Sequence, residues 1–512
     1  MTIFSFFATL IFSLFLLVSP GVHGLTESEI RSWCSQTPHP DSCEYLFAGK
    51  PNLGPIKQKP DFINAILKLT LEKASNAEVN TRSLGGKCRN KHEKVAWQDC
   101  LELYETTVHR INMTIDPQRK CSQVERQTWL STALTNLETC KTGFEEVGSG
   151  EYLLPLMNNN LSALISNTLA MNKGGSTENY EPRYRKGFPT WVKPGVRRLL
   201  QSSNAAPNAN IVVAQDGSSG YKTIGAAIAA AKSGYVIYVK QGTYNEIVQI
   251  GSKLNNIMLV GDGIGKTIIT GSKSAGGGAT SFSSATFAIV GDGFIGRGIT
   301  IRNTAGPQNH QAVALRSASD LSVFYQCSFE GYQDTLYVLS NRQFYKECNV
   351  YGTVDFIFGN AAVVLQNCNI YARNPPNKIN TLTAQGRTDP NQNTGISIHD
   401  SRVAAASSLS GVKTYLGRPW KEYSRTVYLK TYLDSIVNPA GWYPWSGNFA
   451  LNTLYYGEYM NTGPGSSTAN RVNWKGYHVI TSATEASKFD VQSFISGGSW
   501  LPPTGVPFTS GL

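Results

Sequence analysis

The chain has 512 residues, of which 41% are hydrophobic and 16% are charged. This length and composition exclude a disordered polymer and allow two or three packed domains. The formal net charge is +11, and the part from Gln201 onward contributes +7 of it, with 23 Lys and Arg against 16 Asp and Glu. A basic surface favours an acidic partner or serves solubility alone, and nothing else in the sequence indicates binding to nucleic acid.

The first 24 residues contain an apolar run without charges, from Ile3 to Val18, followed by Ser, Pro and Gly. Such a run is typical of a secretory signal peptide and is short for a membrane span. No basic residue precedes it, so an uncleaved membrane anchor is the alternative. We expect a signal peptide in residues 1–24, secretion, an oxidising environment for the nine cysteines, and glycosylation at the sequons of Asn112 and Asn160.

Residues 25–173 are predicted to form an all-α, antiparallel four-helix bundle. Two apolar faces recur at helical spacing, and the runs DFINAILKLTLEKA and LPLMNNNLSALISNTLAM provide two further amphipathic helices. The two faces consist of Trp97, Leu101, Tyr104, Val108 and Ile111, and of Leu130, Ala133, Leu137 and Phe144.

The cysteines of this region suggest two cross-links. Cys34 and Cys43 lie nine residues apart around SQTPHPDS and are predicted to close a local hairpin. Cys100 and Cys140 project from apolar helix faces and are predicted to join neighbouring helices. Two further cysteines of the region have no predicted partner, namely Cys88 and Cys121.

Residues 174–205 are predicted to be a linker. They contain several Pro and Gly residues, clustered Arg and Lys, and no apolar periodicity. Their RRLL sequence, Arg197 to Leu200, places a basic pair between two domains of a secreted chain. Processing proteases cut at exposed pairs of this kind, although a solvated basic loop has the same sequence. We expect cleavage after this segment, by a processing protease that recognises Arg197 and Arg198, to leave a mature protein beginning near Gln201.

Residues 206–512 consist of short β-rich segments separated by Gly and Asn, with an internal repeat. FYQCSFEG, FYKECNVYG and VLQNCNIYA align on Cys327, Cys348 and Cys368, which are 21 and 20 residues apart. This period predicts the stacked coils of a right-handed parallel β-helix. GITIRN and GISIHD fit as further coils with longer loops.

Two acidic residues share one position in this repeat. Asp334 and Asp355 each follow an aligned cysteine by seven residues, so we expect their carboxylates to stack on adjacent coils, about 5 Å apart at the backbone. Carboxylates that close in a partly apolar cleft titrate as a pair, one with a raised pKa and the other ionised. Such a pair can divide the roles of acid and nucleophile or base. The alternative is a purely structural carboxylate stack.

Polar and aromatic side chains near the two carboxylates suggest how they could act. The amides of Gln311 and Gln333 could donate to a developing oxyanion, and Arg418 could keep a carboxylate ionised by bidentate pairing. Trp420 could stack on a sugar face. Each also has a structural alternative, since Gln caps solenoid turns, Arg pairs with any acid, and Trp packs cores.

Five segments, in order, resemble plant pectin methylesterases. They are GTYNE (Gly242 to Glu246), QAVAL (Gln311 to Leu315), YQDTLY (Tyr332 to Tyr337), DFIFG (Asp355 to Gly359) and LGRPW (Leu416 to Trp420). WQDCLELY and TWLSTALTNLETC are similar to the pectin methylesterase inhibitor domain that precedes the enzyme in the family's longer members, and RRLL matches its processing site. The resemblance therefore covers nearly the whole chain.

The resemblance implies a secreted carbohydrate esterase of the cell wall. It would hydrolyse the C6 methyl esters of homogalacturonan, an acidic polysaccharide, and release methanol without a cofactor or metal. It would be a monomer with no nucleic-acid partner, and proteinaceous esterase inhibitors would be further partners. Asp355 would be the nucleophile, Asp334 the general acid and then base, Gln311 and Gln333 the oxyanion stabilisers, and Arg418 the partner of Asp355. The sugar-binding groove would consist of Ser281, Gln311, Tyr337, Phe358, Tyr415, Arg418, Trp420 and Trp442.

Two residues depart from the family pattern. Ser281 replaces a threonine in TSFSSATF, and Leu339 replaces a histidine in LYVLS, so subsite preference or pH optimum is affected more than the reaction. A bridge between Cys348 and Cys368 is expected to leave Cys327 free, and a bridge between Cys327 and Cys348 is the alternative.

Other functions fit parts of the pattern. Polygalacturonases and pectate lyases share the β-helix and the polymer but break glycosidic bonds, which calls for carboxylates about 6.5 to 9.5 Å apart or for an acidic calcium cluster. A wall-binding protein, or a chain acting mainly through its inhibitor-like bundle on other esterases, would need no catalysis. Titration of released methanol against reducing ends separates these classes.

Overall fold

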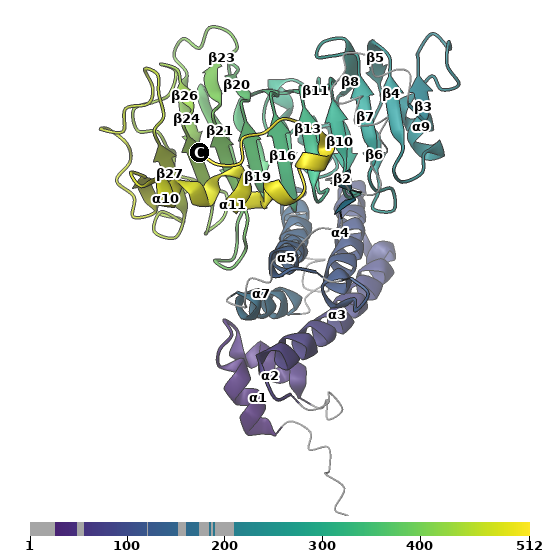
Figure 1. Ribbon diagram of the computed structural model, residues 1–512, viewed down its shortest axis with the longest axis vertical. Coiled ribbons are helices and arrows are strands. Elements are labelled where there is room, and N and C mark those ends of the chain that lie inside the picture. Colours follow the sequence, from purple (N-terminus) through teal and green to yellow (C-terminus); the bar gives the residue numbers. More distant parts are fainter. Residues whose placement is uncertain are drawn as a thin grey trace, which may run out of the picture.

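The computed structural model describes residues 26–48, 56–119, 121–151, 160–173, 184–185, 188–189 and 209–512. The predictions for residues 1–24 and for Arg197 and Arg198 fall outside these ranges. Within them, a helical bundle lies against one side of a long tube of parallel strands (Figure 1). None of the helices in these ranges has the length and apolar composition that a membrane crossing requires.

Three of the four predicted amphipathic runs form the long helices α3 (Lys59–Ser83), α4 (Lys91–Ile115) and α5 (Gln123–Glu146), and the part of the fourth run that lies in the described residues forms α7 (Leu161–Asn172). Sequence signals set where they begin: Asn90 caps α4, and Ser122 and Glu125 form a capping box before α5. The predicted hairpin around Cys34 is instead a pair of short helices, since a capping box starts the first and Pro40 stands at the start of the second. The helices are α1 (Glu27–Cys34), α2 (Pro40–Phe47), α3 (Lys59–Ser83), α4 (Lys91–Ile115), α5 (Gln123–Glu146) and α7 (Leu161–Asn172), with the 3₁₀ turn η1 (Leu84–Lys87) after α3.

Both predicted disulfides of the bundle are present, Cys34–Cys43 and Cys100–Cys140, and the second joins α4 to α5. The predicted bridge between Cys348 and Cys368 is wrong, because both are free thiols, as is Cys327. Equivalent side chains of neighbouring coils point the same way, so their Cβ atoms stay as far apart as the strands, about 4.8 Å, which is wider than the Cβ separation of about 3.5–4.5 Å in a disulfide. The thiols contact backbone carbonyls instead, at 3.4 Å from Cys348 to Phe324 and 3.5 Å from Cys368 to Tyr345.

The tube is a parallel β-helix. In the described residues its strands form three parallel sheets of 11, 8 and 7 strands. The 11-stranded sheet contains β3 (Ile211–Val213), β4 (Val236–Val239), β7 (Met258–Gly261), β10 (Ile295–Arg297), β13 (Ser322–Tyr325), β16 (Arg342–Lys346), β19 (Ala362–Gln366), β22 (Gly395–His399), β25 (Arg425–Leu429), β27 (Tyr455–Tyr459) and β28 (Tyr477–Val479). The 8-stranded sheet contains β5 (Gly242–Asn245), β8 (Thr267–Gly271), β11 (Thr300–Asn303), β14 (Ser328–Glu330), β17 (Asn349–Gly352), β20 (Asn369–Ala372), β23 (Arg402–Ala405) and β26 (Tyr432–Leu433). The seven-stranded sheet contains β6 (Val248–Ile250), β9 (Phe287–Ile289), β12 (Leu315–Ser317), β15 (Leu336–Val338), β18 (Val354–Gly359), β21 (Ile379–Gln385) and β24 (Lys413–Gly417).

The cysteine repeat marks the same corner of three successive coils. Cys327, Cys348 and Cys368 each stand directly before a strand of the 8-stranded sheet, where Ser328 pairs with Asn349 and Asn349 with Asn369. The residue before each cysteine adopts a left-handed conformation, with φ between 52° and 54°, which turns the chain sharply from one sheet to the next. GITIRN contributes β11 to the same sheet, whereas GISIHD forms β22 of the 11-stranded sheet.

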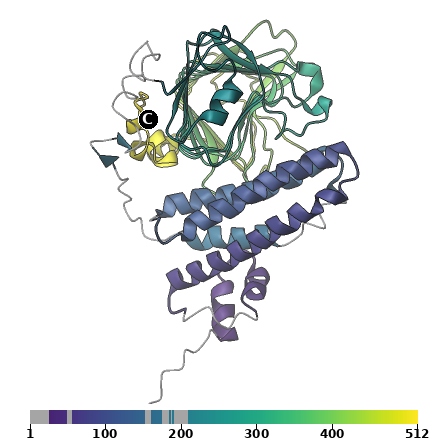
Figure 2. The ribbon, with the colours of Figure 1, turned by 90° about the vertical axis from the view of Figure 1, so that its right-hand side faces the viewer.

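Short elements close the tube. At its N-terminal end α9 (Ile224–Ala230) lies across the opening and buries Ile224 and Ala227 in the tube core (Figure 2). The C-terminal segment packs on the outside of the 11-stranded sheet, where Val491 and Ile495 join Phe344 and Val364 in one apolar cluster. Its elements are α10 (Ala483–Ala486), η5 (Ser487–Phe489), α11 (Val491–Ile495), η6 (Gly497–Ser499) and η7 (Pro502–Thr504). Elsewhere lie the 3₁₀ turns η3 (Ala275–Gly277) and η4 (Pro307–Asn309) and a two-stranded antiparallel pair, β1 (Tyr184–Arg185) and β2 (Phe188–Pro189).

The aromatic stack inside the tube provides a stability test. Phe324 is fully buried and stacks on Tyr345 with ring centroids 4.7 Å apart. We expect Phe324→Ala to lower the free energy of unfolding by about 3–5 kcal/mol, because it removes buried area and leaves a cavity. Chemical denaturation measures the change, with exposed Ile264→Ala as the control. Equal, small effects of both substitutions would contradict a close-packed interior.

Candidate active site

The two predicted carboxylates lie on adjacent coils, at the start of neighbouring strands of the seven-stranded sheet. Leu336 of β15 pairs with Ile357 of β18, and the backbone N–H of Asp334 donates to the carbonyl of Val354 at 3.1 Å. Both acids have left-handed backbones, with φ of 60° at Asp334 and 51° at Asp355. Such backbones in non-glycine residues are strained, typically by about 1–3 kcal/mol each, and concentrate at functional sites.

The carboxylate of Asp355 is held by three hydrogen bonds. Nε and Nη2 of Arg418 donate to its two oxygens at 2.8 and 2.6 Å, and the Thr381 hydroxyl donates to Oδ1 at 2.6 Å. Arg418 follows β24, and Thr381 belongs to β21. Bidentate pairing with a guanidinium stabilises the ionised form of a carboxylate and fixes its plane. The sequence predicted Arg418 but not Thr381, because a threonine within a strand carries no distinguishing signal.

Asp334 has the opposite surroundings. Its side chain is buried, and burial, the charge of Asp355 and the charge of Glu146 raise its pKa well above the ordinary value, in that order of importance, against an opposing effect of Arg418. The group therefore favours its protonated, neutral form. One carboxylate ionised and the other protonated is the arrangement that acid and nucleophile roles require.

Two glutamines lie beside the carboxylates on consecutive coils. The N–H of Ala312, next to Gln311, donates to the carbonyl of Gln333 at 3.2 Å, and Gln333 directly precedes Asp334. Neither side-chain amide bonds to any residue in the described part of the chain. Both amides are half-buried and available to a ligand.

Aromatic rings line the sheet next to the carboxylates. Tyr337 and Phe358 stack with centroids 4.1 Å apart, and Trp420 meets Phe358 edge-on at 5.9 Å. Tyr415, two strands beyond Phe358, packs on Tyr443 at 4.8 Å. Such rings form a platform of the kind that sugars stack on.

Trp442 was predicted to line this groove, and this prediction is wrong. Its side chain belongs to the apolar core inside the tube, where it stacks on Tyr456 at 4.0 Å. The half-exposed ring nearby is Trp445, which lies 4.3 Å from the guanidinium carbon of Arg418. Both tryptophans belong to the segment GWYPWSG, and spacing alone does not distinguish the buried ring from the exposed one.

The bundle covers this region. Helices α4 and α5 lie across the outside of the tube (Figure 2), and their interface with it includes groove residues. Tyr337, Phe358 and Leu339 belong to one apolar cluster with Leu137 and Phe144 of α5. At the C-terminal end of α5, both carboxylate oxygens of Glu146 accept hydrogen bonds from the N–H and hydroxyl of Ser281, at 2.8 Å each.

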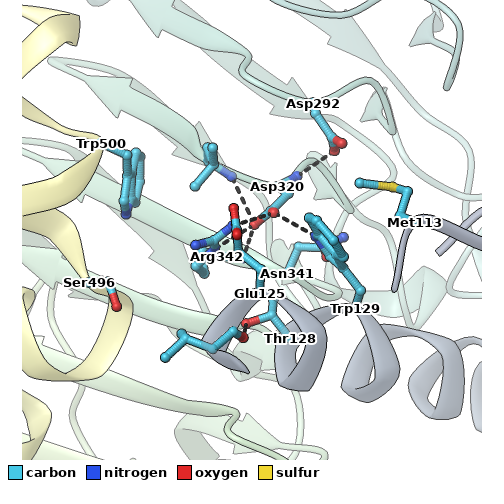
Figure 3. A network of polar contacts seen from close by, with 12 residues as sticks. Met113, Glu125, Thr128, Trp129, Asp292, Asp320, Asn341, Arg342, Ser496 and Trp500 are labelled. Carbon is cyan, nitrogen blue, oxygen red and sulfur yellow. Dashed lines mark hydrogen bonds and ion pairs between the residues drawn. The ribbon is translucent and has the colours of Figure 1, made fainter. Parts of the chain in front are cut away.

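A polar network fixes the bundle at the turns that lead from the seven-stranded sheet into the 11-stranded sheet (Figure 3). Arg110 of α4 pairs with Asp292 through two bonds of 2.7 and 2.6 Å, and Trp129 of α5 donates to Asp320 at 3.0 Å. Asp320 is also held by Arg342, at 3.0 and 2.7 Å. Asp320 is buried with its partners, and Asp292 is partly exposed, so paired charges give the bundle a defined position over the tube.

Two family models match the chain. One described as Pectinesterase covers residues 210–498, and one described as Plant invertase/pectin methylesterase inhibitor covers residues 28–171. The chain is 66% identical to "Pectinesterase 2" of Citrus sinensis over 497 residues, 96% of each chain. It is 62% identical to "Probable pectinesterase/pectinesterase inhibitor 17" of Arabidopsis thaliana over 503 residues, 97% of each chain.

Solved structures match the β-helix. The chain is similar to the pectin methylesterase from carrot with a TM-score of 0.59 and 58% identity, over 60% of this chain and 100% of that one. It is similar to the pectin methylesterase from Aspergillus niger with a TM-score of 0.50 and 33% identity, over 58% of this chain and 96% of that one. The matched part of this chain corresponds to the β-helical tube and leaves out the helical bundle.

The raised pKa of Asp334 predicts a pH-dependent stability cost. Below the ordinary pKa of 3.8 the carboxyl is protonated in both the folded and the unfolded chain. As the pH rises above 3.8, the unfolded chain ionises first, so the wild type loses stability until the pH passes the raised folded pKa. We therefore expect Asp334→Asn to be more stable than the wild type at neutral pH, by a margin that grows from pH 3.8 upward.

Urea denaturation across this pH range measures the margin. Asp216→Asn is the matched control, because hydrogen bonds from Ser218 lower the pKa of the exposed Asp216 carboxyl. The control should change in the opposite direction. A margin for Asp334→Asn that is constant with pH would show that its carboxyl is not shifted.

Proposed function

The chain belongs to the pectinesterase family of carbohydrate esterases, which hydrolyse the methyl esters of pectin, and on this premise we propose how its residues carry out the hydrolysis. The substrate is the C6 methyl ester of a galacturonate unit in homogalacturonan. The observation that carries the assignment is the pair of unlike carboxylates, with Asp355 paired to Arg418 and Asp334 buried beside it.

In the first step an Asp355 oxygen attacks the C6 carbonyl carbon. The carbonyl oxygen becomes an oxyanion, which receives hydrogen bonds from the amides of Gln311 and Gln333. When the tetrahedral intermediate collapses, protonated Asp334 donates its proton to the departing methoxy oxygen, and methanol leaves. The product is an acyl-enzyme in which C6 is bonded to the Asp355 oxygen.

In the second step water replaces the aspartyl group. Asp334, now ionised, accepts a proton from the water as the water oxygen attacks C6. Collapse of the second intermediate breaks the bond between C6 and Asp355, which returns as a carboxylate held by Arg418 and Thr381. The polymer unit leaves as a carboxylic acid, which loses its proton to water and becomes a carboxylate, and Asp334 is protonated again. Arg418 positions Asp355 in both steps, while Tyr337, Phe358, Trp420, Tyr415 and Trp445 form the walls that hold the sugar units.

We also propose that the chain is secreted to the plant cell wall as a precursor. Its sequons are placed for glycosylation, since Asn112 lies exposed on α4 and Asn160 lies exposed before α7. Its bundle acts as a removable pro-region, because α5 covers Tyr337 and Phe358 and places Glu146 on Ser281. Proteolysis after Arg197–Leu200 then releases an open groove, and the mature enzyme acts as a monomer that further inhibitor proteins can bind.

Removal of the nucleophile tests the catalytic assignment. We expect Asp355→Asn to reduce methanol release from processed enzyme to background, since an amide is a poor nucleophile of nearly the same shape. Asp334→Asn should retain more activity, with a loss of about 100- to 10,000-fold, the usual contribution of a general acid. Methanol and reducing ends are titrated together, and circular dichroism confirms folding. Wild-type-like turnover of Asp355→Asn would refute the assignment.

Cleavage at the basic pair is tested by N-terminal sequencing of protein extracted from the wall. We expect a mature chain beginning near Gln201, and an unprocessed chain in the double variant Arg197→Ala, Arg198→Ala, because the protease needs the basic side chains. Methanol release by the double variant should be correspondingly low. Wild-type protein that still begins near Leu25, or normal maturation of the double variant, would contradict cleavage here.

A further inference from the structure

Four acidic side chains of the bundle bind donors in and around the groove. Glu102 of α4 accepts from Gln249 at 3.0 Å and from Arg316 at 3.1 Å. Glu138 of α5 accepts from Lys421 at 2.5 Å. The remaining two acids bind consecutive residues at the groove edge, Asp99 to the Thr280 hydroxyl and Glu146 to Ser281.

The partners of these acids extend along the groove. Gln249 lies on β6, Ser281 precedes β9, Arg316 lies on β12, and Lys421 follows β24 next to Trp420. The acids therefore meet the tube over the length of the seven-stranded sheet and on both sides of the catalytic carboxylates. Their partners are the two cations Arg316 and Lys421 and several neutral donors. Groups of these kinds can bind any carboxylate that lies in the groove.

Glu146 is placed against the preference of its own helix. It is the last residue of α5, whose final turn also contains Glu145 and no basic residue. An acid at a helix C-terminus is typically unfavourable by about 0.3–1 kcal/mol because it faces the negative end of the helix dipole. The two hydrogen bonds from Ser281 offset this cost, so the position of Glu146 follows from the groove and not from the helix.

The network around Asp320 (Figure 3) differs, because there the bundle supplies charges of both signs. Arg110 of the bundle pairs with Asp292, and Glu125 of the bundle lies 3.8 Å from Arg342 of the tube. At the groove, both ion pairs that connect bundle and tube in the described residues join an acid of the bundle to a cation of the tube, where an acidic polymer would lie.

We propose that the four carboxylates of Asp99, Glu102, Glu138 and Glu146 take the places of uronate carboxylates, so that the bundle blocks the groove as a mimic of de-esterified pectin. The inference rests on the assignment of this groove to pectin made above. In the mature enzyme the same donors bind free galacturonate units of the polymer beside the ester under attack.

The mimicry is tested on the ion pair between Glu138 and Lys421, by substituting the acid of the bundle in one variant and the cation of the tube in the other. The probe is a galacturonate hexamer without methyl esters, and its binding to the full chain is measured by calorimetry. We expect Glu138→Gln to tighten binding about tenfold, because the bundle loses a charge-assisted bond and leaves the groove more readily. Lys421→Gln should leave the Kd within about twofold of the wild type, because the same loosening is cancelled by the lost contact with the ligand.

A second pair repeats the design with different chemistry. Glu146→Gln should tighten binding of the hexamer. Ser281→Ala should tighten it less, because the Ser281 hydroxyl donates to the bundle in one state and to the hexamer in the other. Glu145→Gln and Lys141→Gln, which change an exposed pair on α5, are the controls and should leave the Kd unchanged.

The outcomes separate this inference from the proposed function. Equal tightening by the two members of each pair would show that Lys421 and Ser281 serve the bundle alone, and would overturn the mimicry. Absence of hexamer binding by the triple variant Glu102→Gln, Glu138→Gln, Glu146→Gln would overturn it as well. Absence of methanol release from the processed wild-type chain would overturn the proposed function instead.

Discussion

The site depends on the register of stacked coils. A left-handed residue at the corner before each aligned cysteine starts the next strand at the same place, so equivalent residues of successive coils become neighbours. This register places Asp334 beside Asp355 although 21 residues separate them, and Gln311 beside Gln333. The two carboxylates then differ only in their partners, since Arg418 reaches Asp355, while Asp334 is left buried beside a negative charge.

The interface between the bundle and the tube removes further carboxylates from water. Carboxylates removed from water need charged or hydrogen-bonding partners, and each acid in the interface has them. Burial raises the pKa of Asp99 to about 7, and its bond to Thr280 opposes this shift. The bundle is held in position instead by the network around Asp320, whose carboxylate is bound by Arg342 and Trp129.

Much of this arrangement could be read from the sequence, because it follows from periodicity. The cysteine steps of 21 and 20 residues predict the coils, and equal offsets from the cysteines predict that Asp334 and Asp355 meet. Contacts between segments without a shared period could not be predicted. Thr381 reaches Asp355 from another coil, Trp442 turns inward while Trp445 turns outward, and Glu146 reaches Ser281 across two domains. The predicted bridge between Cys348 and Cys368 was wrong because equivalent side chains on successive coils point in the same direction, whereas the two side chains of a disulfide point toward each other.

The distribution of sulfur in the described residues has a redox consequence. Both disulfides lie in the bundle, and one of them, Cys100–Cys140, ties together the two helices that carry all four groove-binding acids. The tube has only buried thiols, Cys327, Cys348 and Cys368, and so has no cross-link to lose. A reductant would therefore loosen the element that covers the site and leave the element that contains it intact, so the thiol balance of a compartment acts on the cover of the groove and not on the esterase beneath it.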